Sequence, residues 1–375
     1  MEPYTLINHI TEDIISNQFK DDYCLMYFPD NIRYNHNLQE HWKFLHDKHL
    51  EALPLPRWHK TPDIFEKGSK KYFFHNEKWI YGLHNPDKLR KYTNYNFYQH
   101  SWEPIDVNLD KFFWDFLQAF NDNRHTIVLH SELNSKDIAK LAGRNIKNVH
   151  WFAHAYICSE FYFKHYKKLK MFTHYKSRPI KYRWLSANRL LRQHRTDLLE
   201  LLDLKRGCYS LANPDPNGLI YTGPVQAHSF DTHENQSAEI SIDDLNPWNT
   251  SFLHVVNETV WQDKIHFTEK IFKPVVMHQP FVVVQAPGSL KYLQSYGFKT
   301  FGDWWDESYD GIEDPTQRLQ AIAKIINDIG GKDISELEKL RMEMAGVLEH
   351  NFHHFYENIP AITLGELENN IRLLS

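Results

Sequence analysis

The chain has 375 residues, with 43 Lys or Arg against 48 Asp or Glu, so its formal net charge is −5. Hydrophobic residues make up 42% and charged residues 24%, which excludes a disordered chain and predicts a globular protein of about two domains. No window approaches the roughly 18 to 20 consecutive apolar residues of a membrane span, and Glu2, Glu12 and Asp13 argue against a signal peptide. We therefore expect a cytoplasmic protein with no membrane partner.

Neither the cysteines nor the histidines predict a metal site. Cys24, Cys158 and Cys208 are far apart and odd in number, so they form neither a disulfide framework nor a CxxC pair, which suits a reducing cytoplasm. Histidine occurs 24 times but without an HExxH motif, and the adjacent His353 and His354 would point apart on a helix. We therefore expect no bound metal and no cofactor.

The first ordered pattern of the chain follows an irregular, aromatic-rich stretch over residues 1–120, in which we expect one helix at 109–121. An apolar run at 126–132 predicts a strand, 135–143 an amphipathic helix, and 148–154 a second strand. These three elements form a βαβ unit with parallel strands. The residues just after its first strand then lie at the carboxyl edge of the sheet, where open α/β sheets bind ligands.

A second series of elements begins near residue 181. Further strands are expected at 181–186, 207–211, 252–256, 280–286 and 299–301. Helices are expected near 193–203, after Ser289 as far as Tyr296, near 315–329 and near 334–350. We therefore predict an α/β fold with a domain at 1–180, a second at 181–350, and a helical tail at 351–375 that packs back on the first.

Positive charge is concentrated between residues 161 and 195, which contain eleven Lys or Arg and no Asp or Glu. This stretch predicts an anionic partner, although a solvated face balanced by acidic residues elsewhere would give the same pattern. Arg189, Arg192 and Arg195 follow the strand at 181–186 at spacings of three, so a helix would present them along one face. Arginine forks near a helix N-terminus suit a diphosphate. The alternative is an arginine-rich face that makes surface salt bridges.

The segment 252–274 carries the most specific pattern. The strand at 252–256, followed by Asn257 and Glu258, leads through a loop to a helix that should begin near Thr268. At such an N-terminus, Glu269 can accept hydrogen bonds from ribose hydroxyls while Lys270 or Lys273 neutralises phosphate. Alone, the Thr-Glu-Lys sequence would be an ordinary helix cap.

The Asn-Glu pair ahead of Thr-Glu-Lys-Ile-Phe-Lys resembles the signature of the α1,3-fucosyltransferase family, in which the Glu-Lys pair lies in the donor site. The segment 185–195 resembles the family's Asn-Arg segment, where an arginine contacts the diphosphate. His266 stands where these enzymes often have Tyr. Residues 252–310, together with 130–132 and 150–154, also resemble glycosyltransferases encoded by tailed bacteriophages.

The resemblance implies a GT-B fold, with two facing Rossmann-like domains that bind an acceptor at 1–180 and a GDP- or UDP-linked sugar at 181–350. It implies a glycosyltransferase that inverts the anomeric centre without an obligatory metal. The residues expected to bind the donor are Asn188, Arg189, Arg192, Arg195, Asn257, His266, Thr268, Glu269, Lys270 and Lys273.

Inverting transfer needs a base for the acceptor hydroxyl. We expect Glu132 in this role, because it follows a predicted strand of the N-terminal domain, although it could equally cap a helix. His130, His154 and Glu258 are alternatives, since histidine titrates near neutrality and Glu258 lies nearer the donor. His130 and His154 could also be structural residues of the core, and His154 could contact the acceptor.

Two acceptors compete. The phage-like resemblance and the basic stretch favour a hydroxylated base in phage DNA, with phosphates bound by Lys167, Lys168, Lys170 and Lys176. The net charge of −5 instead favours a glycan or small saccharide held by Trp and Tyr side chains. A binding protein for carbohydrate or nucleic acid, without turnover, is the non-enzymatic alternative.

Overall fold

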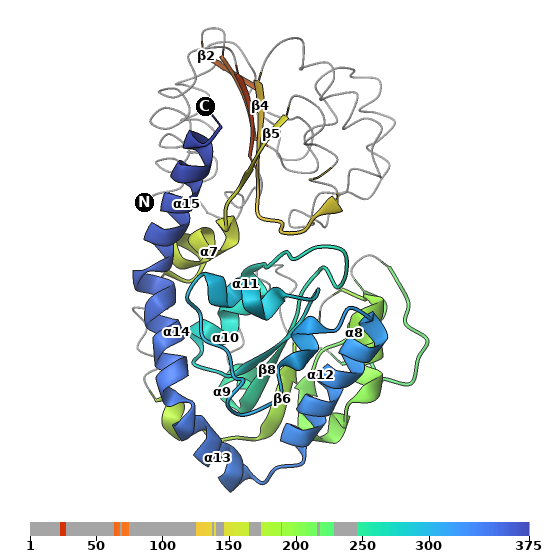
Figure 1. Ribbon diagram of the computed structural model, residues 1–375. Coiled ribbons are helices and arrows are strands. Elements are labelled where there is room, and N and C mark those ends of the chain that lie inside the picture. Colours follow the sequence, from red (N-terminus) through yellow and green to blue (C-terminus); the bar gives the residue numbers. More distant parts are fainter. Residues whose placement is uncertain are drawn as a thin grey trace. The chain divides into compact units, whose positions relative to one another are not determined.

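The computed structural model describes residues 23–27, 64–67, 70–74, 125–136, 139, 146–164, 174–188, 190–215, 218–228 and 246–374 (Figure 1). By its internal contacts the chain divides into two compact units. The N-terminal unit comprises Met1–Ile157 with Thr363–Ser375, and the C-terminal unit comprises Cys158–Ile362. The described strands form one β-sheet in each unit, and the chain is an α/β protein. The predicted domain boundaries and the roles of the two domains remain predictions.

The sheet of the N-terminal unit has five strands in the order β2-β3-β1-β4-β5. The strands are β1 (Tyr23–Tyr27), β2 (Ile64–Lys67), β3 (Lys70–Phe74), β4 (His125–His130) and β5 (Ile146–His150). All neighbouring pairs are parallel except β2 and β3, which form an antiparallel edge. The parallel pairing of β4 with β5 confirms the predicted pair of strands, whereas the helix expected at 109–121 lies outside the described residues.

One predicted strand is too long. β5 ends at His150, and a helix, α7 (Ala153–Ile157), begins where the strand was expected to continue to His154. Trp151 and the residues after it as far as Ile157 are buried. The helix therefore has no exposed polar face from which a helical period could be recognised in the sequence. A short, continuous apolar run does not distinguish a buried strand from a buried helix.

The C-terminal unit contains four parallel strands in the order β7-β6-β8-β9. They are β6 (Tyr182–Ser186), β7 (Gly207–Tyr209), β8 (Ser251–Asn257) and β9 (Phe281–Val284). Every residue of β8 and β9 is buried, because helices cover both faces of a parallel sheet and the strands therefore read as continuous apolar runs.

The helices of this unit lie on both sides of its sheet. They are α8 (Gln193–Leu201), α9 (Asn246–Asn249), α10 (Phe272–Val276), α11 (Ser289–Ser295), α12 (Pro315–Gly330), α13 (Ile334–Glu343) and α14 (Ala345–Glu357). Figure 1 shows α8 and α12 on one side of β6 and β8, and α10 and α14 on the other. The single helix expected at 334–350 is thus two, separated at Met344. The last helix, α15 (Ile359–Arg372), ends in the N-terminal unit.

The strand expected at 299–301 does not form. The backbone N–H of Lys299 donates to the side-chain oxygen of Asn351 at 2.8 Å, and its carbonyl accepts from the Asn351 amide nitrogen at 2.9 Å. The Asn351 amide therefore satisfies both groups that a neighbouring strand would pair. Within the described ranges, no helix has the length and apolarity needed to cross a bilayer.

Candidate functional site

The strand order of the C-terminal sheet identifies a ligand-binding edge. From β6 the chain passes to β7 on one side, and then returns to β8 on the other side of β6. The topological switch point therefore lies between the carboxyl ends of β6 and β8, where open α/β sheets bind ligands. Asn188 follows β6 here, and Asn257 and Glu258 end and follow β8.

Buried amide and hydroxyl groups fix these strand ends to one another. The Asn257 side-chain nitrogen donates to Ser186 Oγ and to Asn188 Oδ1, each at 2.9 Å. The Asn188 side-chain nitrogen also donates to Ser186 Oγ at 2.9 Å, and its backbone N–H donates to Ser210 Oγ, just past β7, at 2.8 Å. Because these hydrogen bonds join three strands, the edge is a rigid platform.

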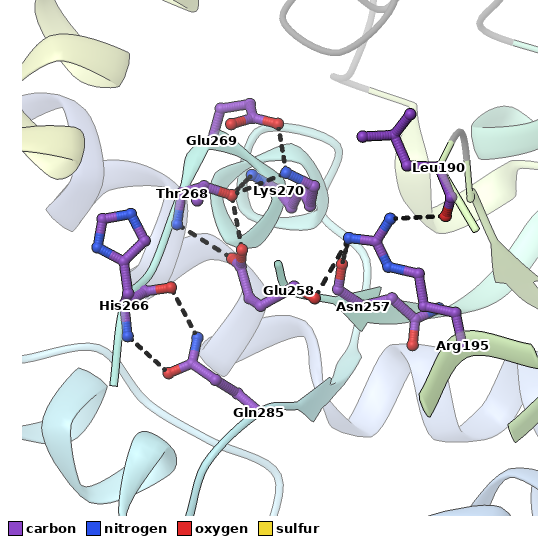
Figure 2. A network of polar contacts seen from close by, with 9 residues as sticks. All are labelled: Leu190, Arg195, Asn257, Glu258, His266, Thr268, Glu269, Lys270 and Gln285. Atoms are coloured by element: carbon purple, nitrogen blue, oxygen red, sulfur yellow. Dashed lines mark hydrogen bonds and ion pairs between the residues drawn. The ribbon is translucent and has the colours of Figure 1, made fainter. Parts of the chain in front are cut away.

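Arg195 fixes the first turn of α8 to the same platform. Its guanidinium donates to the backbone carbonyls of Leu190, Asn257 and Glu258 at 3.1 to 3.2 Å (Figure 2). The side chain is buried. Arg195 therefore holds the carboxyl end of β8 against α8, and its guanidinium group is hydrogen-bonded to main-chain oxygens.

The spacing of three predicted that Arg192 and Arg195 share a helical face, and this is wrong. Arg192 is the N-cap of α8 and has an extended backbone, so the helix begins only after it, and Arg189 lies outside the described residues. Helix α8 has no acidic residue in its first turn and no side-chain cap. Its N-terminus is therefore suited electrostatically to an anion.

Glu258 is fully buried and is held by one residue. The Thr268 N–H donates to one oxygen of its carboxyl group at 3.2 Å, and the Thr268 hydroxyl donates to the other at 2.6 Å. Burial raises the pKa of Glu258, the charge of Glu269 adds to this rise, and Lys270 and the Thr268 hydrogen bonds oppose it. A buried carboxyl group that already accepts two hydrogen bonds is better suited to fixing the loop at 259–267 than to removing a proton from a substrate.

Thr268 in turn organises the Thr-Glu-Lys sequence. It is the N-cap of a 3-10 turn, Glu269–Ile271, that continues into α10, which confirms the predicted helix start. The ammonium group of Lys270 lies 3.1 Å from Thr268 Oγ and 3.0 Å from Glu269 Oε1. Burial opposes ionisation of Glu269, but Lys270 and Lys273 outweigh it and lower its pKa, so the carboxylate is charged at neutral pH.

Lys273 is buried on α10 and acts on its neighbours by its charge. Burial, with the charge of Lys273, lowers the pKa of His254 to about 3. Burial raises the pKa of the Cys158 thiol, and Glu269 and Glu258 raise it further. Lys273 and Lys270 oppose this rise, but the pKa of the thiol stays well above its ordinary value, so Cys158 is neutral.

Two further contacts fix the loop between β8 and α10. The backbone N–H of His266 donates to the side-chain oxygen of Gln285 at 3.2 Å, and its carbonyl accepts from the Gln285 amide nitrogen at 3.1 Å. In Figure 2 the His266 ring points away from Gln285. At the start of the loop, His194 Nε2 donates to the Glu258 carbonyl at 3.1 Å, and the His194 ring stacks on Trp261.

Burial and the charge of Arg195 lower the pKa of His194 to about 3, so this ring is neutral at physiological pH. Arg318 lies over the Trp261 ring at 4.1 Å and donates to the Trp261 carbonyl at 2.9 Å. Sequence reasoning did not select His194, Trp261, Gln285 or Arg318. Gln285 stands at the carboxyl end of a predicted strand, which is the one sequence signal that could have identified it.

The residues expected at the N-terminal sheet come together at its carboxyl edge, and all are buried. His130, Glu132 and His154 are each at most 5% exposed. Ser131 Oγ lies 3.5 Å from His154 Nδ1, and the rings of His130 and His150 meet edge to face at 5.6 Å. The structure therefore places these candidate residues close together, but their side chains are buried.

The lysines expected to bind an acceptor divide into two groups. Lys167, Lys168 and Lys170 lie outside the described residues. Lys176 is about half exposed and forms an ion pair of 2.8 Å with Glu349. The positive charge of Lys176 is therefore compensated by a carboxylate of the same unit.

In the part of the chain that the structure describes, no three His, Cys, Asp or Glu side chains converge as a metal ion would require. The absence of a metal cofactor stays a prediction. The chain matches no protein-family model and no curated protein.

Proposed function

We propose that this protein is a nucleotide-sugar-dependent glycosyltransferase of the GT-B type, and that its C-terminal unit binds the donor. The observation that supports this most is the chain of hydrogen bonds from Glu258 through Thr268 to Lys270, beside the switch point of a parallel sheet. It holds a charged carboxylate and an ammonium group side by side at a helix start. Those two groups match the ribose hydroxyls and the diphosphate of a nucleotide sugar.

The two arginines have different roles in this proposal. Arg195 is engaged by three main-chain carbonyls, so we assign it to the platform. Arg192 lies at the N-cap of α8, where the helix dipole and the N–H groups of the first turn also favour an anion. Arg192 and Lys270 would then stabilise the diphosphate as it leaves, without an obligatory metal ion.

The acceptor supplies a hydroxyl group that attacks the anomeric carbon of the donor sugar with inversion, and the nucleoside diphosphate leaves. The phage-like sequence segments and the basic stretch at 161–195 support a hydroxylated base in DNA as the acceptor. The net charge of −5 supports a glycan instead. Both acceptors use the same donor chemistry, so the donor is tested first.

A thermal-shift screen of the full chain against GDP, UDP, CDP and their sugars tests the proposal. A ligand at 100 times its dissociation constant stabilises the folded protein by about 2.7 kcal/mol. Lys270→Ala should abolish the shift, whereas Lys291→Ala, which removes an exposed lysine from α11, should retain it. If no nucleoside diphosphate or nucleotide sugar shifts the melting temperature, the protein is not a nucleotide-sugar transferase.

A further inference from the structure

A histidine and a glutamate that are far apart in the sequence meet at the carboxyl end of β5. His150 Nδ1 lies 3.0 Å from Glu366 Oε1 on α15, although the two residues are 216 positions apart. The second oxygen of Glu366 accepts from the Phe152 N–H at 2.8 Å. The Asn370 side chain, one turn further along α15, donates to the His150 carbonyl at 2.6 Å. Both the ring and its backbone are therefore fixed.

The partner of the ring determines its tautomer. An ionised carboxylate only accepts hydrogen bonds, so the proton of the neutral imidazole lies on Nδ1. The lone pair is then on Nε2, which is the nitrogen that can take up a proton.

The exposure of His150 separates it from the bases that the sequence predicted. Its side chain is 21% exposed, whereas Glu132 and His154 are at most 3% exposed. His150 lies at the same sheet edge, where α/β sheets bind ligands. Two ionisable side chains that contact its ring are Glu366 from α15 and His130 from β4.

We propose that His150 is the catalytic base of this enzyme and that Glu366 is its positioning residue, an inference that rests on the proposed glycosyltransferase function. Nε2 of His150 takes the proton of the acceptor hydroxyl while the acceptor oxygen forms its bond to the anomeric carbon of the nucleotide sugar. The bond from that carbon to the diphosphate breaks, and the diphosphate leaves with the electron pair. The imidazolium then returns its proton to water.

A second pair in the same chain supplies a matched control. His353 Nδ1 lies 3.0 Å from Glu357 Oε1 on α14, the same atoms at the same separation. These two residues are one helical turn apart and are 62% and 52% exposed, away from any strand end. Removing this pair should not alter transfer.

The test uses the full chain, the nucleotide sugar that gives the thermal shift, and two acceptors, hydroxymethylcytosine DNA and an oligosaccharide panel. His150→Ala should lower kcat at least 100-fold, as expected for loss of a general base, and leave the KM and affinity for the donor unchanged. Added imidazole should restore part of the activity, which it would not do for a structural histidine. His353→Ala and Glu357→Gln should keep wild-type kcat.

Glu366→Gln keeps the side-chain shape but removes the charge behind the ring, and it should lower kcat with no change in donor affinity. Wild-type kcat in His150→Ala would overturn the proposal, and so would a folded His150→Ala protein whose lost activity imidazole does not restore. If His150→Ala does not fold, unchanged kcat in Glu366→Gln would overturn it instead. A wild-type protein that binds no nucleotide sugar would refute the glycosyltransferase function itself.

Discussion

The hydroxyl of Thr268 donates a 2.6 Å hydrogen bond to Glu258, and its backbone N–H donates to the second oxygen of the same carboxyl group. Ten residues separate the two, so this contact closes the loop between β8 and α10. It also places the cap that presents Glu269 and Lys270. The two sequence motifs of the C-terminal unit are thus one hydrogen-bonded structure, with the first supporting the second.

Breaking either side of this contact should impair donor binding and stability together. Thr268→Val removes the hydroxyl while keeping the shape, so Glu258 and the Lys270 ammonium both lose a partner. A double-mutant cycle with Glu258→Gln, measured by urea unfolding and by nucleotide affinity, should give a coupling energy of about 1 to 3 kcal/mol. Thr268→Ser should behave like the wild type. If the effects of the two substitutions were additive, this contact would not stabilise the loop.

Gly297 ends α11 in a conformation that other residues adopt at a cost. Its φ is +91°, its N–H bonds the Gln294 carbonyl, and the next N–H, of Phe298, bonds the Leu293 carbonyl, which is a Schellman end. An added Cβ would lie 2.8 Å from the ring of His354. Gly297→Ala should therefore lower the free energy of unfolding by about 1 to 2 kcal/mol or more.

Gly346 is the control for this substitution, because it lies in α14 and an added Cβ there meets nothing within 4 Å. Gly346→Ala should raise the free energy of unfolding by about 0.5 to 1 kcal/mol. Thermal unfolding of both variants measures the difference. Equal stability of the two variants would show that the backbone at 297 is not constrained as described.

The sequence predicts the C-terminal sheet well because β8 and β9 are largely apolar runs bounded by polar residues. It fails at Trp151–Ile157, where burial on all sides removes the periodic signal, and at Lys299, where a side-chain amide replaces a strand. Both failures have one cause, since tertiary contacts decide the outcome there.

In the candidate site, too, the sequence predicts some of the contacts and misses others. Thr268, Glu269 and Lys270 are neighbours in the sequence, so their arrangement follows from a helix cap, and the pattern predicts it. Glu366 reaches His150 across 216 positions, and no local pattern links them. Arg195 was expected to bind the donor, but two of the carbonyls it binds lie at the end of β8, which spacing along the chain does not reveal.

Arg318 should be essential to the loop that precedes Thr268. Its guanidinium lies over Trp261, and it donates to the carbonyls of Ile312, Glu313 and Trp261. Arg318→Met would remove the donor of three carbonyls and the cation over Trp261, so the free energy of unfolding should fall by at least about 2 kcal/mol, and nucleotide affinity should fall with it.

Lys324→Ala on the same helix is the comparison for Arg318, since Lys324 is exposed and pairs only with Asp328 one turn away. Its melting temperature and nucleotide affinity should be nearly those of the wild type. An Arg318→Met protein as stable as the Lys324→Ala protein would contradict the role given to the guanidinium.

Buried histidines should make the C-terminal unit less stable as the pH falls. Burial lowers the pKa values of His194, His254 and His278 to about 3, each with help from a nearby cation. Between pH 6.5 and pH 3 these histidines bind protons in the unfolded chain but not in the folded chain. The free energy of unfolding therefore decreases as the pH is lowered. The lowered pKa of Glu269 acts in the same direction, but only near and below its ordinary value of 4.5.

Urea unfolding of the wild type and of His254→Phe at pH 7.5, 6.5, 5.5 and 5.0 isolates the contribution of this histidine, because the carboxyl groups, including Glu258 with its raised pKa, are the same in both proteins. Each such histidine contributes a slope of up to about 1.4 kcal/mol per pH unit below its unfolded pKa. His254→Phe should make the slope shallower by one such contribution, whereas His353→Gln, which removes an exposed histidine, should change it much less. A wild-type slope in His254→Phe would mean that the folded protein already carries a proton on His254, and burial would then not be the dominant influence on that ring.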